Sequence, residues 1–451
     1  MERRTPANQS EPFDDVNLFV ADQALQAAVI REGAAFAVSA LEAFGAEAGS
    51  AEMQRHARRA NTHPPSLETH DPRGERVDRI VVDESYHALM RTSMAVGLHA
   101  RSFSHLAGSE TVATGTNVAR AAGVILASQM EPGHVAPLSM TNASIAALLN
   151  DAGMAQTMVP KILEPHYDPR LRHMSEKASL TVSLALSERH GVSDLASART
   201  RAERIGDESE GNADGYRLNG EKWFLSAPMS DAFLVLAEAP GGLSCFMMPR
   251  VLPDGEMNGI QFNRLKPTLG HHALAVVDAV FDDAQAWPVG EAGAARTTLA
   301  DTLALMRLDG ALVTLGLMRR AVSEAIHHAR QRRIGGAPLV GQPLAAQVLA
   351  DMALHTEAAT ALTLRLARAF DQPDDEQERA WARLMTPVTA YWVCKSAPHL
   401  IAEAMECLGG NGFAEDFPLA TLYREAPAHA LWQGGGNILA LDVMQVLQRD
   451  P

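Results

Sequence analysis

Cysteine is scarce in this chain, with three in 451 residues: Cys245, Cys394 and Cys407. An odd number of widely spaced cysteines excludes a disulfide framework and a CxxC metal site, and it fits a reducing compartment. Aromatic residues make up 5% of the sequence. No run of apolar residues reaches the roughly 18 needed to span a bilayer, and the polar N-terminus (MERRTPANQSEPFDD) lacks the apolar core of a secretory signal. We therefore expect a cytoplasmic protein with no membrane segment.

Long blocks of positive charge are also missing. The formal net charge is -15, and the runs Arg319–Arg320 and 330–333 are short and lie in helical patterns. A phosphate backbone would be repelled by this total, so nucleic acid is not expected as a partner. HExxH, Walker and GxSxG motifs are absent. The adjacent pairs His271–His272 and His327–His328 do not share a face of a helix or strand, so no metal site is expected.

The pattern of apolar residues changes twice along the chain. Residues 1–177 show three-and-four spacing broken at Pro64–Pro65, which predicts an all-helical N-terminal domain. Residues 178–288 contain short segments rich in Val, Leu and Thr, with turn signals at Asn219–Gly220 and Gly241–Gly242, and predict a middle β domain. Residues 289–451 return to long apolar-striped helices. The predicted fold class is α+β, mainly α, with a helical domain, a β domain and a long-helix bundle.

Four local motifs carry a more specific signal. They are SLALSERHGVSD (183–194), GEKWFLSAP (220–228), ARQRRIGGAPLVGQPLAAQVLADM (329–352), and ECLGGNGF with LYREAPAHALWQGGGNILALD (406–442). Together, in this order and spacing, they resemble the acyl-CoA dehydrogenase superfamily over nearly the whole chain. The N-terminal lead, with REGAAF and ANTHPPSLETHDPRGERVD, is similar to that of its AidB-like branch.

The resemblance implies FAD as cofactor and assigns residues to it. Ser187 would lie at the flavin ring, Ser193 near the pyrophosphate, and the Phe224–Ser226 segment along the isoalloxazine. Arg332 and the Gly409–Gly410 pair would meet the FAD of a neighbouring subunit, which implies a homotetramer or at least a dimer. The cofactor-binding residues expected in this way are Leu186, Ser187, Ser193, Phe224, Leu225, Ser226, Arg332, Gln342, Gly409, Gly410, Trp432, Gly434, Gly435, Gly436 and Asn437. Gly335 departs from the family pattern, which usually has Phe there.

The expected catalytic position carries the wrong residue for a base. The family removes the α proton of an acyl thioester with a carboxylate and passes the β hydride to the flavin. Most members supply this base as Glu in a WEG or YEG triplet, whereas this chain has Trp432–Gln433–Gly434. The alternative family position, on the long helix after the β domain, matches Met306. Asp309 is expected to form a packing contact or salt bridge rather than to act as the base. His429, four residues before Gln433, is the second candidate that could reach the site.

Three interpretations remain open. The chain is an acyl-CoA dehydrogenase-like oxidoreductase acting on an acyl-CoA or related small acyl substrate, with its base relocated. It is a repurposed flavoenzyme, with a desulfinase-like elimination or an oxygen-using reaction, in which Gln433 orients the substrate. Or it is a non-catalytic, AidB-like flavin-binding protective protein. AidB-like proteins associated with DNA contact carry an additional basic C-terminal domain, and the sequence ends at Pro451 after the last helix of the shared pattern, so DNA binding is not expected.

Overall fold

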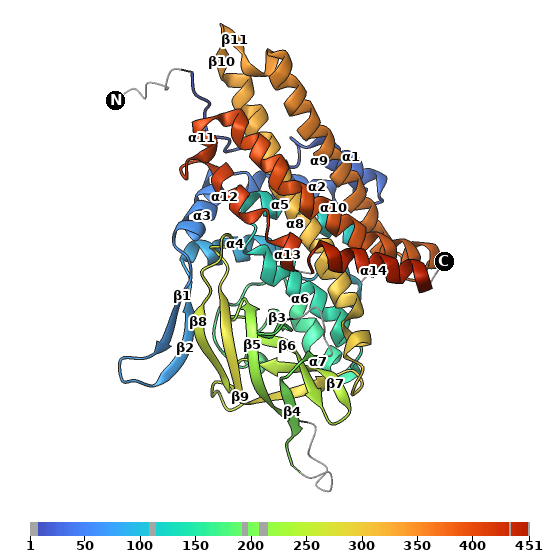
Figure 1. Cartoon of the computed structure of the whole chain (residues 1–451). Coiled ribbons are helices and arrows are strands. Elements are labelled where there is room, and N and C mark those ends of the chain that lie inside the picture. The colour runs from blue at the N-terminus through green and yellow to red at the C-terminus, as the bar shows by residue number, and fades with distance from the viewer. Residues whose placement is uncertain (1–7, 108–113, 192–196, 207–214, 433, 450–451) are drawn as a thin grey trace. The chain divides into compact units, whose positions relative to one another are not determined.

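The computed structural model describes residues 8–107, 114–191, 197–206, 215–432 and 434–449. Its contacts group the chain into two compact units. The first, here the helical unit, combines Met1–Arg55, Thr114–Pro132 and Arg307–Pro451. The second, the sheet unit, combines His56–Ala113 and Gly133–Met306. Helices α3 (Ala51–Thr62) and α8 (Ala295–Gln331) contribute to both units (Figure 1). Each unit gathers segments that are distant in sequence. The units therefore do not test the expected division into three consecutive domains, which stays a prediction.

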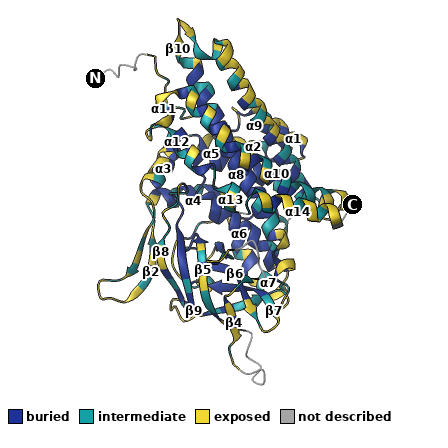
Figure 2. Cartoon of the chain, viewed as in Figure 1, coloured by how far each residue is buried: buried dark blue, intermediate teal, exposed yellow. Residues whose placement is uncertain are grey.

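Long helices build the helical unit. They are α1 (Gln23–Arg31), α2 (Val38–Ala48), α5 (Thr116–Met130), the C-terminal part of α8, α9 (Pro343–Phe370), α10 (Glu376–Leu408), α12 (Pro418–Glu425) and α14 (Gly436–Arg449). The short elements are η1 (Ala35–Ala37), β10 (Arg333–Ile334), β11 (Ala337–Pro338), η6 (Leu339–Gly341), α11 (Gly410–Phe413) and α13 (His429–Trp432). Helix α5 is buried almost all round, as its Ala-, Val- and Ile-rich sequence requires (Figure 2). The long helices predicted within residues 289–451 are confirmed as α8, α9 and α10.

A seven-stranded sheet organises the sheet unit. Its strands are β3 (Val182–Ala185), β4 (Arg201–Arg204), β5 (Tyr216–Ser226), β6 (Ala232–Ala239), β7 (Gly242–Pro249), β8 (Ile260–Leu265) and β9 (Val276–Val289). The order is β3-β6-β4-β5-β9-β7, with β8 beside β9 and β7 pairing β6 as well as β9. The second pairing of β7 closes the sheet, which leaves few unpaired edge groups. Helices α4 (Glu84–Ala95), α6 (Val135–Leu148) and α7 (Ala152–Ile162) and the 3-10 turns η2 (Arg101–Ala107) and η3 (Met174–Glu176) complete the unit.

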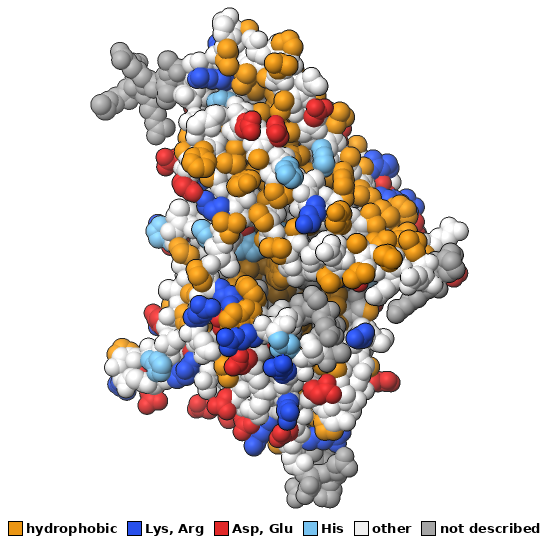
Figure 3. Space-filling model, viewed as in Figure 1, with side chains coloured by type: hydrophobic (Ala, Val, Ile, Leu, Met, Phe, Trp, Pro, Cys, Tyr) orange, Lys and Arg blue, Asp and Glu red, His pale blue; other side chains and the backbone are white. Residues whose placement is uncertain are grey.

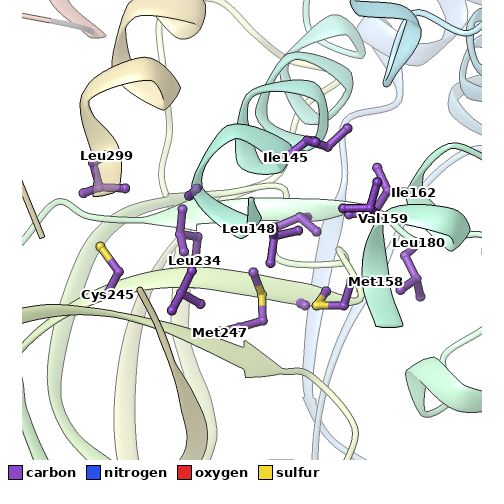
Figure 4. Packing of buried hydrophobic residues seen from close by; sticks show 14 of the residues in the cluster. Ile145, Leu148, Met158, Val159, Ile162, Leu180, Leu234, Cys245, Met247 and Leu299 are labelled. Atoms are coloured by element: carbon purple, nitrogen blue, oxygen red, sulfur yellow. The ribbon is translucent and has the colours of Figure 1, made fainter. Parts of the chain in front are cut away.

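Strand β6 is buried on both faces, which explains its continuous apolar run. Leu234 and Leu236 join a core with α6, α7 and the start of α8 (Figure 4). Phe233 and Val235 point into the other core, inside the sheet. Because successive strand side chains alternate between faces, each face of β6 requires its own apolar set. The Gly241–Gly242 turn joins β6 to β7, with Ala239 opposite Gly242, as predicted.

Two sequence expectations were wrong. The N-terminal region is not all-helical, because β1 (Ser66–His70) and β2 (Arg76–Val81) form an antiparallel hairpin. Its turn is held by Asp71, whose Oδ1 accepts bonds from the N–H groups of Arg73 and Glu75, and by Gly74 at φ +88°. The exposed, charge-rich strands bury few side chains, so their period of two was hidden by polar residues on both faces.

The second error is the hairpin expected at Asn219–Gly220, because these residues lie inside β5. The pairing of β5 with β9 shifts between Leu218 and Gly220, which marks a bulge. A Cβ at Gly220 would come within 2.7 Å of Thr200, so the glycine serves a close approach of strands rather than a turn. No helix of the described residues is long and apolar enough to cross a membrane.

Candidate functional site

The exit of β3 and the end of β5 lie together in the sheet unit. The N–H of Trp223 donates to the carbonyl of Ser187 at 3.0 Å, and the Ser183 hydroxyl donates to the carbonyl of Ser226. These two hydrogen bonds join the first two motifs, although 36 residues separate Ser187 from Trp223 and 43 separate Ser183 from Ser226. Leu186 packs against the core, and Ser187 is half-exposed. Ser193 lies outside the described residues.

A bulge in β5 exposes one of the expected flavin contacts. Lys222 pairs with Ala279 and Leu225 with Val277, so β5 carries one more residue than β9 across this interval. Phe224 adopts φ +60°, unfavourable for a bulky side chain, and stays 50% exposed. Leu225 and Ser226 are buried. Bulges re-aim side chains beside active sites, and here the bulge turns an aromatic ring out of the core.

Cationic side chains surround the neighbouring Trp223. The Nζ of Lys266 lies 3.3 Å from the centre of the indole ring, and the guanidinium carbons of Arg189 and Arg264 lie 5.7 and 5.8 Å away. Lys266 and Arg264 also pair with the carboxylate of Asp278 on β9. Cation–π contacts of this kind fix the plane of the ring. The residues beside the bulge therefore combine an indole ring with three cationic side chains, two of which share the carboxylate of Asp278.

A buried ion pair joins β5 to the residues just after β3. Lys222 Nζ donates to Glu188 Oε1 at 2.9 Å and to the carbonyl of Leu236 at 2.7 Å. Burial lowers the pKa of Lys222 to about 8, against the attraction of Glu188. Burial alone would raise the pKa of Glu188, but Lys222 and hydrogen bonds from Thr200 and Arg199 hold it at about 2. The pair was not found from sequence, since each residue reads as an ordinary polar position of a strand.

The helical unit contains a cavity of about 550 Å³ that collects three of the expected FAD contacts. Arg332, directly after α8, lines it together with Gly409 and Gly410, where α10 ends and α11 begins. A Cβ added at either glycine would meet no atom within 4 Å, so the turn leaves open space beside its main chain. Gly409 has φ +61° and ψ -135°, a conformation that glycine alone adopts readily. An arginine facing a bare glycine turn suits the diphosphate and adenosine of FAD.

The electrostatics of the cavity depend on a few side chains. His328 is buried, and this burial lowers the pKa of its imidazole. The positive charge of Arg332 and the neighbouring His327 lower the pKa further, so the imidazole is neutral at neutral pH. Burial, and then Glu403 and Glu406, raise the pKa of the Cys407 thiol to about 11. The lining thus offers the guanidinium of Arg332 to an anion, while the two glutamates present acceptors for hydroxyl groups.

The remaining expected contacts lie elsewhere in the helical unit. Gln342 caps α9 and its amide donates to the carbonyl of Ile334 at 3.3 Å, so it does not line the cavity. Trp432 ends α13, where its ring stands 5.6 Å from that of His429. Gly434 has φ +106°. A Cβ at Gly436 would come within 2.8 Å of Tyr391, so this glycine allows α14 to start against α10.

Gly435 is half-exposed and Asn437 is exposed at the start of α14. Gln433, the expected catalytic position, lies outside the described residues. Gly335, where the family usually has Phe, has φ +59° in the β10–β11 turn. A glycine fits this left-handed conformation better than an aromatic residue does.

The candidate replacements for the base are placed clearly. The Asp309 carboxylate accepts two bonds from the Arg120 guanidinium, at 2.7 and 2.6 Å, and both side chains are 3% exposed. The salt bridge expected for Asp309 is confirmed, and its partner on α5 was not foreseen. Met306 is buried. His429 packs against α8, because a Cβ added to Gly310 would lie 3.5 Å from its Nδ1.

Family models cover most of the chain. An AidB N-terminal domain matches residues 8–169, an acyl-CoA dehydrogenase middle domain matches residues 183–284, and an acyl-CoA dehydrogenase C-terminal domain matches residues 296–448. The putative acyl-CoA dehydrogenase AidB of Escherichia coli is 42% identical over 446 residues, covering 99% of this chain and 80% of that protein. Acyl-CoA dehydrogenase family member 11 of Caenorhabditis elegans is 30% identical, covering 88% of this chain and 64% of that protein.

Solved structures agree on the fold. The crystal structure of C. elegans ACDH-11 in complex with C11-CoA superposes with a TM-score of 0.89 and 26% identity, covering 99% of this chain and 76% of that one. Butyryl-CoA dehydrogenase of Megasphaera elsdenii has the same fold, with a TM-score of 0.72 at 18% identity, over 95% of this chain and 99% of that one. The α+β, mainly helical fold expected from the sequence is confirmed. The chain therefore belongs to the acyl-CoA dehydrogenase family, in its AidB-like branch, whose members are FAD-dependent flavoproteins.

Proposed function

We propose that the protein is a FAD-dependent oxidoreductase of the acyl-CoA dehydrogenase type that acts on an acyl-CoA or a related acyl substrate, with Gln433 at the position of the usual catalytic glutamate. One observation carries the proposal: Arg332 meets the Gly409–Gly410 turn in one cavity, although about 77 residues separate them in the chain. Its chemistry suits a dinucleotide diphosphate.

Different residues of the chain would have different roles in binding FAD. Arg332 would neutralise the diphosphate of a neighbouring subunit's FAD, and Gly409 and Gly410 would let its adenosine approach the main chain. Ser187 and the bulged Phe224–Ser226 segment would support the flavin ring, while the Lys222–Glu188 pair holds β5 to the residues just after β3. FAD supplies the acceptor for a hydride from the substrate. An acyl-CoA as substrate class is supported by ACDH-11, whose solved structure is a complex with C11-CoA.

Replacing Gln433 by glutamate tests the assignment. An amide orients a thioester through hydrogen bonds but does not accept its α proton at neutral pH. We expect Gln433→Glu to raise the rate of flavin reduction by acyl-CoAs on the order of 10²-fold, the usual range for one general base. The measurement is the visible flavin spectrum after anaerobic addition of short, branched and C11 acyl-CoAs, with Gln433→Ala as control. Equal reduction rates for all three proteins would show that residue 433 does not meet the substrate α carbon.

A second candidate function follows from the contacts of Asp309. Its carboxylate accepts both bonds from the Arg120 guanidinium, so the acidic candidate for the missing base already has a structural partner. This favours a flavin reaction that needs no α-proton base, such as an elimination or an oxygen-using oxidation. His429→Gln separates this from a relocated base. Loss of acyl-CoA-dependent flavin reduction in that variant would make His429 the base, whereas unchanged oxygen consumption with an acyl substrate would support the base-free reaction.

A homotetramer, or at least a dimer, completes the proposal. Large apolar side chains remain exposed on α9 and α14, including Leu344 at 81% and Leu354 at 65% exposure. On the face in Figure 3, apolar side chains gather over α9, α10 and α14. Exposed apolar surface of this kind marks association sites. Light scattering of the FAD-loaded protein should give a multiple of 48.4 kDa, and Leu354→Glu should reduce it. A flavin-loaded monomer would contradict this.

A further inference from the structure

The segment Asn8–Phe13, here called the N-terminal strap, lies along the C-terminal end of α8 in the helical unit (Figure 1). Contacts with α8 or with the residues just after it recur along the strap. The hydroxyl of Ser10 contacts His328 Nδ1 at 3.0 Å, and the N–H of Glu11 donates to Gln331 Oε1 at 2.9 Å. The ring of Phe13 lies 5.1 Å from the guanidinium carbon of Arg320. The segment has no regular secondary structure and is held by these polar and ring contacts.

Asn8 clamps the chain just after α8. Its side chain donates to the carbonyl of Arg333 at 3.0 Å and accepts from the N–H of Arg333 at 2.7 Å. The main-chain carbonyl of Asn8 accepts from Arg332 Nη1 at 2.6 Å. Asn8 adopts φ +64°, which asparagine tolerates better than most residues do. The clamp and the carbonyl together fix the direction of the Arg332 side chain.

Gln9 extends the strap to the other side of the cavity. It lines the cavity, and its Oε1 accepts a bond from Asn411 Nδ2 at 2.9 Å. Asn411 directly follows Gly409 and Gly410, so the strap connects the end of α8 with the glycine turn. An arginine has five N–H donors, so the bond to Asn8 leaves donors for a phosphate. A guanidinium already held in place loses less conformational entropy when a phosphate binds.

We propose that the N-terminal strap is a positioning element of the FAD site: Asn8 orients Arg332 toward the diphosphate, and Gln9 forms the wall that faces the adenosine. This inference rests on the proposed function, because it takes the cavity to be the FAD site. It adds a segment that none of the four flavin motifs contains. The strap residues touch no reacting atom and act through Arg332 and Asn411.

The test removes the two side chains together. Asn8→Gly/Gln9→Ala deletes the clamp and the cavity wall, and glycine accepts φ +64° without strain. Glu11→Ala is the matched control, because Glu11 holds α8 through its main-chain N–H and carbonyl. The full-length apoproteins are titrated with FAD by flavin fluorescence, and melting temperatures are recorded with and without FAD. We expect about tenfold weaker FAD binding in the double variant, an unchanged melting temperature without FAD, and a smaller FAD-induced increase.

Each outcome decides the question. FAD binding equal to that of Glu11→Ala would overturn the proposal, and tighter binding would show that the strap obstructs the cavity. An equal fall in melting temperature with and without FAD would show that the contacts only stabilise the fold. Arg332→Ala separates this inference from the proposed function. If Arg332→Ala loses FAD affinity and the strap variant does not, only the strap assignment fails, whereas unchanged binding in Arg332→Ala would remove the FAD site itself.

Discussion

The two regions proposed to hold FAD are built in different ways. In the sheet unit, Ser187 and Trp223 are joined by a main-chain hydrogen bond between the exit of β3 and β5, and their side chains take no part in it. In the helical unit, Arg332 and the Gly409–Gly410 turn meet because helices pack and a short strap connects them. Backbone pairing tolerates side-chain substitution, whereas an assembly of helix ends depends on individual contacts. The second region should therefore respond more strongly to single substitutions at its surface.

Each unit also contains a buried ion pair, and the two pairs differ in their cation. Arg120 and Asp309 join α5 to α8, while Lys222 and Glu188 join β5 to the exit of β3. A buried arginine stays charged, but a buried lysine can release its proton. Loss of the carboxylate therefore leaves a permanent charge in the helical unit and a removable one in the sheet unit.

The largest effect is expected for Asp309→Asn. The substitution leaves the Arg120 guanidinium buried without its bidentate carboxylate, and breaking a buried pair in this way costs about 3–5 kcal/mol. Urea unfolding followed by circular dichroism measures the loss. The control Arg120→Met/Asp309→Leu removes both charges and should recover most of the stability. If the control is stable and its FAD is still reduced by substrate, Asp309 has no role in chemistry; a stable control that has lost reduction would make Asp309 the relocated base.

Glu188→Gln is expected to lower the free energy of unfolding by a smaller amount, about 2 kcal/mol at neutral pH. Burial has already lowered the pKa of Lys222 to about 8, and removal of Glu188 lowers it further, so the lysine can become neutral. The cost should therefore shrink as the pH is raised toward the ordinary lysine pKa. Urea unfolding at a series of pH values compares this variant with Asp309→Asn, whose cost should not depend on alkaline pH. Equal pH dependence in both variants would contradict the difference assigned to the two cations.

Acid acts on the same pair in the unmodified protein. The pKa of Glu188 is about 2 in the folded state and near 4.5 when unperturbed. Its carboxylate therefore contributes its full stabilisation above about pH 4.5, and that contribution is lost as the pH falls toward 2. The unfolding free energy of the wild type should fall across this window more steeply than that of Glu188→Gln. Parallel curves would show that the carboxylate does not titrate with the predicted shift.

Much of the fold was predictable because it depends on local apolar periodicity. The three-and-four pattern of α8, α9 and α10 and the apolar runs of β6 and β7 predicted these elements. The β1–β2 hairpin was missed because its strands are exposed and polar on both faces. Gly220 was misinterpreted because the pair Asn219–Gly220 is typical of a tight turn, whereas here the glycine allows a close approach of the main chain at Thr200.

The site was predictable only as far as motif resemblance reached. The meeting of Arg332 with Gly409 follows from packing over a long sequence separation, which no local pattern contains. The Arg120–Asp309 and Lys222–Glu188 pairs, and the clamp of Asn8 on Arg333, have the same origin. Each residue alone looks like an ordinary polar position, and only the fold gives it a partner.

The smallest effect concerns the cavity itself, where Gly410→Val should weaken FAD binding about tenfold, or about 1.4 kcal/mol. A side chain at Gly410 meets no protein atom within 4 Å, so it projects into the space assigned to adenosine and does not disturb the fold. Gly341→Val is the matched control, since its Cβ also meets no atom within 4 Å and it does not line the cavity. Fluorescence titration with FAD should show weaker binding for Gly410→Val alone, at equal melting temperatures of the apoproteins. Equal affinities would place the adenosine outside this cavity, and the strand ends of the sheet unit would then be the one region still proposed to hold FAD.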